Sequence, residues 1–344
     1  MNRPLEQPQY LERLLAVAKA NERGTALVFK SRGAWQSLSW GQLLQEIDGA
    51  AAGLAKLGVS PGGLVAVDGE VTSRLLIVAA AAKSLGAHLV AVPLAASQEE
   101  LDAIIANPAV QLVIGHGRET VAEWQRFAGR HRPVPIVFDH VTPDSRSPGE
   151  GIVTYAELLA LAPRHGWSDA PVTRSLRLPT GLAWFEETTD WPGALESVLD
   201  HWLQPGTAVA LPESHIAAAR DRAEIQPTVW LASSRALERQ AKSFQERLPD
   251  AGRVTRKLVD NALSPGAAPW SRFIRWKLRR QLGLGRIAAV HLHLAPGQAI
   301  SENITGFLLG LQVNAFIGEE LLPVAGHRTV SARIASYPVA EGAR

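Results

Sequence analysis

The sequence predicts an α/β fold of two or three subdomains, with mostly parallel sheets flanked by helices. Short β-rich runs bounded by Gly, Pro or Asn alternate with helical patterns along most of the chain. This alternation is typical of parallel strands that are joined by helical crossovers. At 344 residues, of which 46% are hydrophobic, the chain is long enough to bury substantial cores.

The order of the predicted elements indicates two α/β subdomains. In the first, over residues 1–165, strands are expected at 26–30, 64–68, 88–92, 111–114 and 135–138, and helices at 41–57, 73–84, 98–105 and 119–127. Segments rich in turn-forming residues, 143–151 and 163–178, predict irregular connections. In the second subdomain, over residues 166–344, strands are expected at 181–185, 208–211, 228–232 and 287–294.

The composition excludes several classes of protein and site. Because the chain has no cysteine, it holds no disulfide, no Cys-based zinc site and no thiol nucleophile. Residues 1–20 contain only a short apolar run at 14–17 and carry charged side chains, unlike a secretory signal. The longest apolar stretch, 75–82, is far shorter than the roughly 20 residues that span a bilayer. We therefore expect a cytoplasmic protein.

Basic residues gather late in the chain, although the formal net charge is only +2. One helical pattern combines them with aromatic residues and predicts a surface for an anionic membrane or an acidic partner; its members are Trp270, Arg275, Trp276, Lys277, Arg279 and Arg280. Alternatively, Trp270, Phe273, Ile274 and Leu278 form one face that packs on a sheet, with the arginines solvated opposite. No nucleic-acid recognition motif accompanies the charge, so we expect no nucleic-acid partner.

Residues 184–195 read Trp-Phe-Glu-Glu-Thr-Thr-Asp-Trp-Pro-Gly-Ala-Leu and follow a predicted strand. The segment resembles the phosphate loop of AMP-forming acyl-CoA synthetases, which reads roughly Thr-Ser-Gly-Thr-Thr-Gly-x-Pro-Lys-Gly. The matching residues are Thr188, Thr189, Pro192 and Gly193. Glu186 and Glu187 replace Ser-Gly, Asp190 replaces the next glycine, and no lysine separates Pro192 from Gly193.

These replacements remove the chemistry that a phosphate loop uses. Glycines let several backbone N–H groups point at one phosphate, and the lysine adds a positive charge. A carboxylate about 4 Å from a phosphate charge costs about 1 kcal/mol in water and about 4 kcal/mol near a protein surface. The resemblance therefore implies that the ATP, Mg²⁺ and CoA binding of the family is lost, and we expect no cofactor.

Segments outside this loop resemble the same family in the same order. Residues 35–40 and 52–63 are similar to its opening motifs, and 64–67 and 91–94 to its V-A-I and V-x-V-P-L segments. Downstream, 225–230 with Arg235 and Glu238 resembles a motif of the long-chain fatty-acid–CoA ligases, and 278–286 resembles the helix before the adenine-binding strand. The resemblance implies the large N-terminal domain of adenylate-forming (ANL superfamily) enzymes and a link to lipid metabolism.

The chain departs from the family at its nucleotide-binding motifs. Where the family has Ser-Gly-Gly-Ala-Pro, the sequence from His291 to Pro296 retains only Ala295 and Pro296. Where the family has Tyr-Gly-x-Thr-Glu, this sequence has Phe316-Ile-Gly-Glu319-Glu320 and retains only Glu320. The chain ends soon afterwards, so we expect the family's C-terminal domain to be absent.

His291 and His293 point to one face of a predicted strand, a spacing that suits two metal ligands. In the family's architecture, this strand end lies near the degenerate loop and Glu319/Glu320, so a Zn²⁺, Mn²⁺ or Fe²⁺ site is one hypothesis. The alternative is a set of surface acids beside a buried, hydrogen-bonded histidine.

The sequence therefore predicts a degenerate acyl-CoA synthetase-like protein without ATP-dependent ligase activity. We expect it to bind an acyl or other hydrophobic ligand, or to bind a partner as a regulatory or assembly protein. That partner would be an intact paralogue or a second copy of the chain. The alternatives are a ligase fragment that a separate polypeptide completes, a repurposed metal-binding protein and a membrane-peripheral adaptor.

Overall fold

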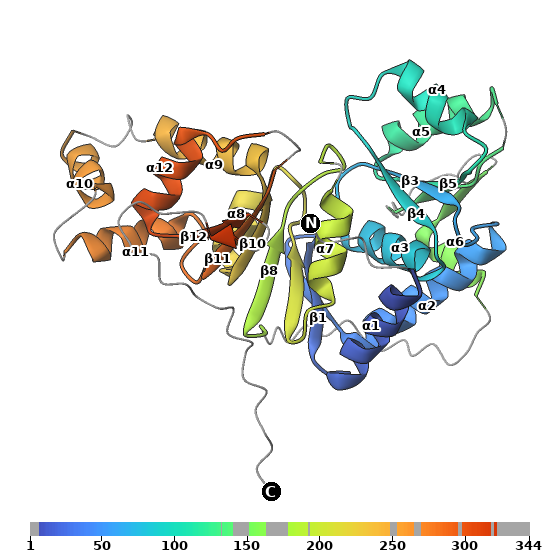
Figure 1. The fold of residues 1–344 in the computed structure, drawn as a ribbon, viewed down its shortest axis with the longest axis horizontal. Coiled ribbons are helices and arrows are strands. Elements are labelled where there is room, and N and C mark those ends of the chain that lie inside the picture. The colour runs from blue at the N-terminus through green and yellow to red at the C-terminus, as the bar shows by residue number, and fades with distance from the viewer. Residues whose placement is uncertain are drawn as a thin grey trace, which may run out of the picture.

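Two sheets covered by helices make up the computed structural model of the chain (Figure 1). The structure describes residues 7–131, 133–139, 151–162, 178–191, 193–247, 253–264, 270–294, 298–317 and 320–321. Within these residues, the larger sheet has eight strands in the order β13-β12-β11-β10-β8-β9-β1-β2, and the smaller has five in the order β4-β3-β5-β6-β7. Nearly all neighbouring strands are parallel, which confirms the predicted α/β class.

The five-stranded sheet follows the predicted alternation of strands and helices. Its strands are β3 (Leu64–Asp68), β4 (His88–Val92), β5 (Val110–Gly115), β6 (Ile136–Phe138) and β7 (Ile152–Thr154). The helices of this part of the chain are α1 (Gln7–Ala20), α2 (Trp40–Lys56), α3 (Ser73–Ser84), α4 (Gln98–Ala106), α5 (Arg118–Ala128) and α6 (Tyr155–Ala160). Side-chain capping boxes begin α2 at Ser39, α4 at Ser97 and α6 at Thr154.

The eight-stranded sheet is formed by β1 (Thr25–Ser31), β2 (Ala34–Ser39), β8 (Gly181–Phe185), β9 (Thr207–Leu211), β10 (Val229–Ser233), β11 (Ala289–His293), β12 (Asn314–Ile317) and β13 (Glu320–Leu321). Strand β1 pairs in parallel with β9, so this sheet takes two strands from the segment that the sequence assigns to the first subdomain. Apolar periodicity identifies a strand but not the strand that it pairs with, so the sequence does not show that β1 and β2 belong to the larger sheet.

Helices cover both faces of the larger sheet. They are α7 (Ala194–Trp202), α8 (Ala218–Ile225), α9 (Ser234–Arg247), α10 (Arg253–Leu263), α11 (Ser271–Gln281) and α12 (Glu302–Leu311). Helix α7 lies toward the smaller sheet and contacts α3, whereas α10, α11 and α12 gather at the opposite end of the molecule (Figure 1).

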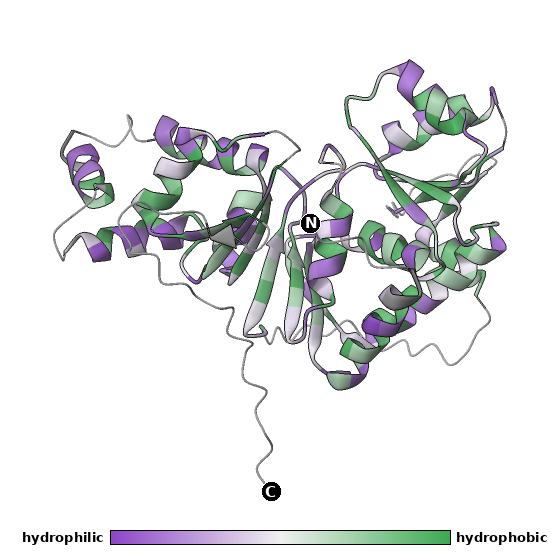
Figure 2. Ribbon diagram, in the orientation of Figure 1, coloured by the Kyte–Doolittle hydropathy of each residue, from purple (hydrophilic) through white to green (hydrophobic). Residues whose placement is uncertain are grey.

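A shared apolar core joins the two sheets. Helix α3 is buried on all sides from Leu75 to Lys83, because it lies between α1, α2, α7 and the smaller sheet. This position explains an alanine-rich sequence with no polar face. Figure 2 shows the same hydrophobic character along the strands of both sheets. Among the described residues, no helix is both long and apolar enough to cross a membrane.

Candidate functional site

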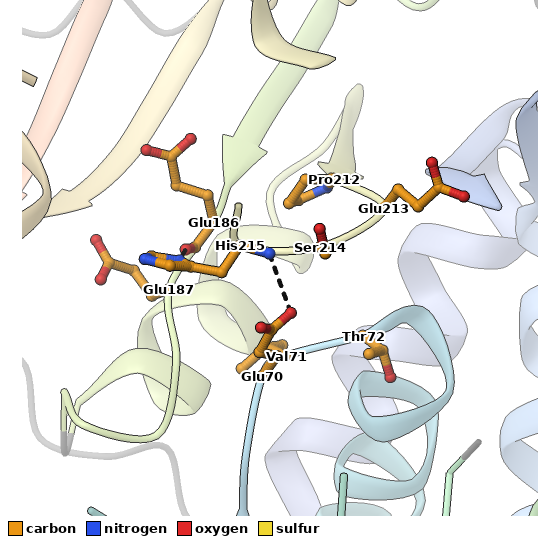
Figure 3. Close-up of a pocket in the computed structure, with 9 residues that line it drawn as sticks. All are labelled: Glu70, Val71, Thr72, Glu186, Glu187, Pro212, Glu213, Ser214 and His215. Atoms are coloured by element: carbon orange, nitrogen blue, oxygen red, sulfur yellow. Dashed lines mark hydrogen bonds between the residues drawn. The ribbon is translucent and has the colours of Figure 1, made fainter. Parts of the chain in front are cut away.

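The candidate site lies where strands of the two sheets end close together. Segments that follow β3, β8 and β9 line a small cavity (Figure 3), whose residues are Glu70, Val71, Thr72, Glu186, Glu187, Pro212, Glu213, Ser214 and His215. In α/β proteins, ligands bind outside the carboxyl ends of parallel strands, so this is the expected place for a site. The cavity measures about 10 Å³, which is roughly the space that one water molecule needs.

Glu186 pairs with a buried arginine rather than facing an empty anion site. Both carboxylate oxygens accept hydrogen bonds from Nη1 of Arg222, at 2.9 and 2.8 Å, and Glu186 also accepts from the indole of Trp184. Arg222 is fully buried and lies 4.0 Å from the ring centroid of Trp230. Its other nitrogens donate to Gln240 and to the carbonyl of Leu282. The arginine is therefore fully engaged inside the protein.

Glu187 is held at the start of helix α9. Its Oε1 accepts from the backbone N–H of Ser233 at 2.7 Å, and its Oε2 accepts from the Ser233 hydroxyl at 3.0 Å. Burial raises the pKa of Glu187, and the neighbouring Glu186 carboxylate raises it further. A carboxylate at a helix N-terminus satisfies donors that would otherwise be open to an anion.

The two threonines of the loop connect it to the smaller sheet. Thr189 is fully buried; its N–H donates to the carbonyl of Gly69 at 3.1 Å, and its Oγ1 accepts from the Gly69 N–H at 3.0 Å. Thr188 forms an isolated bridge with Glu70. The backbone and side chains that match a phosphate loop are thus used to join the two sheets.

Asp190 closes the other side of the loop. Its Oδ1 accepts from the backbone N–H of Leu94 at 2.7 Å, and its Oδ2 lies 3.5 Å from Nη1 of Arg235. Gly193 directly precedes α7 and has a negative φ of −89°. Pro192 lies outside the described residues. Each of the three acidic replacements, Glu186, Glu187 and Asp190, therefore has a hydrogen-bond partner within the protein.

Two histidines that the sequence did not single out lie near the cavity. The backbone N–H of His215 donates to Glu70 at 3.0 Å (Figure 3), and its Nδ1 lies 3.1 Å from the carbonyl of Glu186. His116 Nδ1 lies 3.0 Å from both oxygens of the buried Asp139, which also accepts from the hydroxyl of Thr72. Burial lowers the pKa of His116 and the Asp139 carboxylate raises it, with a net rise.

His291 and His293 share the face of β11 that α7 covers. The His291 ring stacks on Phe316 at 5.6 Å and lies 6.0 Å from the ring of His201 on α7. His293 lies 5.0 Å from Trp191, and its Nε2 is 3.2 Å from the hydroxyl of Ser197. Burial lowers the pKa of all three histidines, that of His201 to about 4.

The described residues contain no group of three or more His, Asp or Glu side chains arranged to hold a metal ion. The two predicted histidine ligands are brought together, but Glu186, Glu187 and Asp190 bond elsewhere. Ala295, Pro296 and Glu319 lie outside the described residues, and only the backbone of Glu320 is described, in β13. The metal hypothesis therefore stays a prediction.

The basic and aromatic stretch forms helix α11, with a different face buried from the one that apolar spacing indicates. Trp270, Phe273 and Trp276 are 49%, 66% and 49% exposed. Arg275 is instead buried and donates to the carbonyl of Ala262 at 2.7 Å. Arg279 donates to the carbonyls of Leu284 and Ile287. Both arginines hold the fold, so the exposed part of the predicted surface is Trp270, Trp276, Lys277 and Arg280.

Comparisons with known proteins agree with this fold. Residues 14–163 match the family of AMP-binding enzymes. The A domain of carboxylic acid reductase from Segniliparus rugosus, solved with AMP and a co-purified carboxylic acid, has 15% identity and a TM-score of 0.64, over 89% of this chain and 60% of that chain. Acetoacetyl-CoA synthetase from Streptomyces lividans has 14% identity and a TM-score of 0.56, over 89% and 51%. No curated protein sequence matches the chain.

These matches confirm the fold of the N-terminal domain of adenylate-forming enzymes. The carboxylate reductase A domain from Mycobacterium chelonae, at 16% identity, likewise has a TM-score of 0.64 over 93% of this chain and 59% of that chain. The chain spans 52% to 60% of the length of the first three such structures. The similarity does not favour long-chain fatty-acid ligases over other branches.

Proposed function

We propose that this chain, built on the adenylate-forming fold, is a non-catalytic relative of the long-chain fatty-acid–CoA ligases and acts as a partner-binding protein. It does not bind ATP, Mg²⁺ or CoA and does not activate a carboxylic acid. The observation that carries the proposal is the closed network of the loop, in which Glu186 bonds Arg222 and Glu187 bonds Ser233.

The network opposes nucleotide binding in two ways. The donors that could meet a phosphate, the Arg222 guanidinium and the N–H at the start of α9, already serve carboxylates. For a phosphate to take their place, a buried charge would have to lose its partner, and that costs about 3–5 kcal/mol. Since each 1.4 kcal/mol or so is a factor of ten in affinity, the loss is roughly 100-fold to 1,000-fold or more.

A binding role is supported by two exposed apolar side chains, one next to the cavity and one next to the loop. Ile216 is 95% exposed and directly follows His215, which lines the cavity. Leu94, whose N–H donates to Asp190, is exposed as well. Ligand pockets measure about 300–1,000 Å³, so a cavity of about 10 Å³ favours a contact with another protein over small-molecule binding. The long-chain branch rests on residues 225–230, with Arg235 and Glu238.

Calorimetric titration of the full chain with ATP and Mg²⁺ tests this proposal. We expect no binding at millimolar ATP or AMP, whereas the A domain from Segniliparus rugosus, solved with AMP, provides the positive control for the AMP titration. The variant Asp190→Asn removes the most exposed loop charge and keeps an oxygen for the Leu94 N–H. We expect no ATP binding by this variant either, because the other two carboxylates keep their partners.

Micromolar ATP binding by the unaltered chain would overturn the proposal. A thermal shift with fatty acids or acyl-CoAs in the same samples distinguishes the two binding roles. A shift would point to a hydrophobic ligand and would contradict a purely partner-binding role, and its absence would support that role.

A further inference from the structure

We propose that the exposed face of helix α11 docks on an anionic membrane surface. This inference does not depend on whether the chain binds ATP. Helix α11 lies at the end of the molecule opposite the five-stranded sheet (Figure 1). Its sequence, Ser-Arg-Phe-Ile-Arg-Trp-Lys-Leu-Arg-Arg-Gln, contains no acidic residue.

Aromatic and cationic side chains lie together on one side of α11. At 100° per residue, the exposed residues fall on one half of the helix, and they are Trp270, Arg272, Phe273, Trp276, Lys277, Arg280 and Gln281. The opposite half contains the buried Ser271 and Arg275 and contacts α10 and α12. The amphipathic division is therefore set by packing, with the aromatic side facing solvent.

Exposed aromatic residues are concentrated on this helix. Among the described residues, the large aromatic side chains that are exposed are Trp270, Phe273 and Trp276. Phe273 and Trp276 stack at 5.9 Å, and the guanidinium of Arg280 lies 5.7 Å from the Trp276 ring. Neither Arg272 nor Lys277 has an ion pair within the part of the chain that the structure describes. The exposed face of α11 thus combines solvent-exposed aromatic rings with positive charge.

The surrounding sequence strengthens the positive field. Residues 253–286 contain nine Lys and Arg but a single Asp, although the whole chain has a net charge of only +2. Helix α10 packs beside α11 and exposes Arg256, Lys257 and Leu258. A local excess of this kind attracts an anionic surface within a Debye length.

The mixing of rings and cations favours a lipid surface over a protein partner. Protein interfaces place their aromatic residues in a core from which lysine is depleted, with charges at the rim. On α11, Phe273 lies between Lys277 and Arg280 on the helical projection, so the cations interrupt the aromatic patch. At a membrane, tryptophan sits at the headgroup level while lysine and arginine reach lipid phosphates, so the same mixture is favourable.

Flotation of the full chain with lipid vesicles tests the proposal. We expect binding to phosphatidylcholine vesicles that contain phosphatidylglycerol, and none to phosphatidylcholine alone. The triple variant Arg272→Gln, Lys277→Gln, Arg280→Gln should weaken binding roughly 100-fold, since each cation near an anionic surface contributes about fivefold. The double variant Phe273→Ser, Trp276→Ser should also lose most of the binding.

The matched control is Lys19→Gln, Arg23→Gln, Arg126→Gln, which removes the same charge from exposed positions elsewhere. We expect this control to bind vesicles within a few-fold of the unaltered chain. Equal losses in both triple variants, or no vesicle binding by the unaltered chain, would overturn the proposal. Sedimentation without lipid tests whether a second copy of the chain binds this face instead. A dimer that the α11 variants dissociate, together with no vesicle binding, would assign the face to that second copy.

Discussion

Replacing Arg222 with Met should lower the free energy of unfolding by about 3–5 kcal/mol. Arg222 is fully buried and donates both short hydrogen bonds to Glu186, whose side chain is only 9% exposed. Methionine fills a similar volume but leaves this carboxylate without its charge partner. Urea denaturation at neutral pH, followed by circular dichroism, measures the loss.

The neighbouring Arg220 provides the control. It lies two residues away on the same helix, is 63% exposed and forms ion pairs with Glu213 and Glu224 at the surface and with the buried Asp221, which keeps Lys30 as a second partner. Because exposed ion pairs contribute about 0–1 kcal/mol, Arg220→Met should cost less than about 1 kcal/mol. A loss that small in Arg222→Met as well would mean that the loop network does not hold the fold.

A double variant separates the pair from its surroundings. Glu186→Gln keeps an oxygen that can accept from Arg222 but removes the charge, so we expect a smaller loss than in Arg222→Met. Combining Glu186→Gln with Arg222→Met should cost less than the sum of the two, because the buried charges are then removed together. Additive losses would instead show that the two side chains act independently.

The sequence predicts the fold well because its signals are local. The strands around residues 64–68, 181–185 and 228–232 are apolar runs, and they form β3, β8 and β10 within a residue or so. The acidic character of the loop after β8 is also visible in the sequence, since Glu186, Glu187 and Asp190 stand where the phosphate loop that it resembles has uncharged residues. Both signals depend on residues that are close together in the chain.

Signals that depend on tertiary contacts are absent from the sequence. Arg222 lies 36 positions from Glu186 on another element, and nothing local indicates that they meet. The buried face of α11 is also set by distant groups, because Arg275 donates to the carbonyl of Ala262 on α10. Apolar spacing indicated that Trp270 and Phe273 would pack, but their side of the helix is exposed.

The second large effect that we predict is a loss of stability in acid, centred on His201. This histidine lies on α7, is 7% exposed, and its Nε2 has no hydrogen-bond partner among the described residues. Burial, helped by the neighbouring His291 and His293, lowers its pKa from 6.5 to about 4. The folded protein therefore keeps the ring neutral at a pH where the unfolded chain protonates it.

The sign of the effect follows from proton binding. Between pH 6.5 and about 4 the unfolded chain binds more protons at this position than the folded protein, so stability falls as pH falls. The contribution of His201 is complete above pH 6.5, is smaller by about 2 kcal/mol at pH 5, and is smaller by about 3 kcal/mol below pH 4. His291 and His293, whose pKa values burial also lowers, act in the same direction.

Buried carboxyl groups act in the opposite direction and require a difference measurement. Burial raises the pKa of Asp68 to about 6, so this group stabilises the fold as pH falls. We therefore compare unaltered protein with His201→Phe by urea denaturation at pH 7 and pH 5. The variant should lose about 2 kcal/mol less stability between these two values.

The same change at His88, an exposed residue of β4, controls for replacement of a histidine ring by phenylalanine. We expect the pH dependence of His88→Phe to match that of the unaltered chain. If His201→Phe also retained the full acid loss, the histidines between α7 and β11 would not be the acid-sensitive element. If the acid loss shrinks by about 2 kcal/mol as expected, protonation of His201 destabilises the packing of α7 against the sheet, and α7 begins directly after the loop that joins the two sheets.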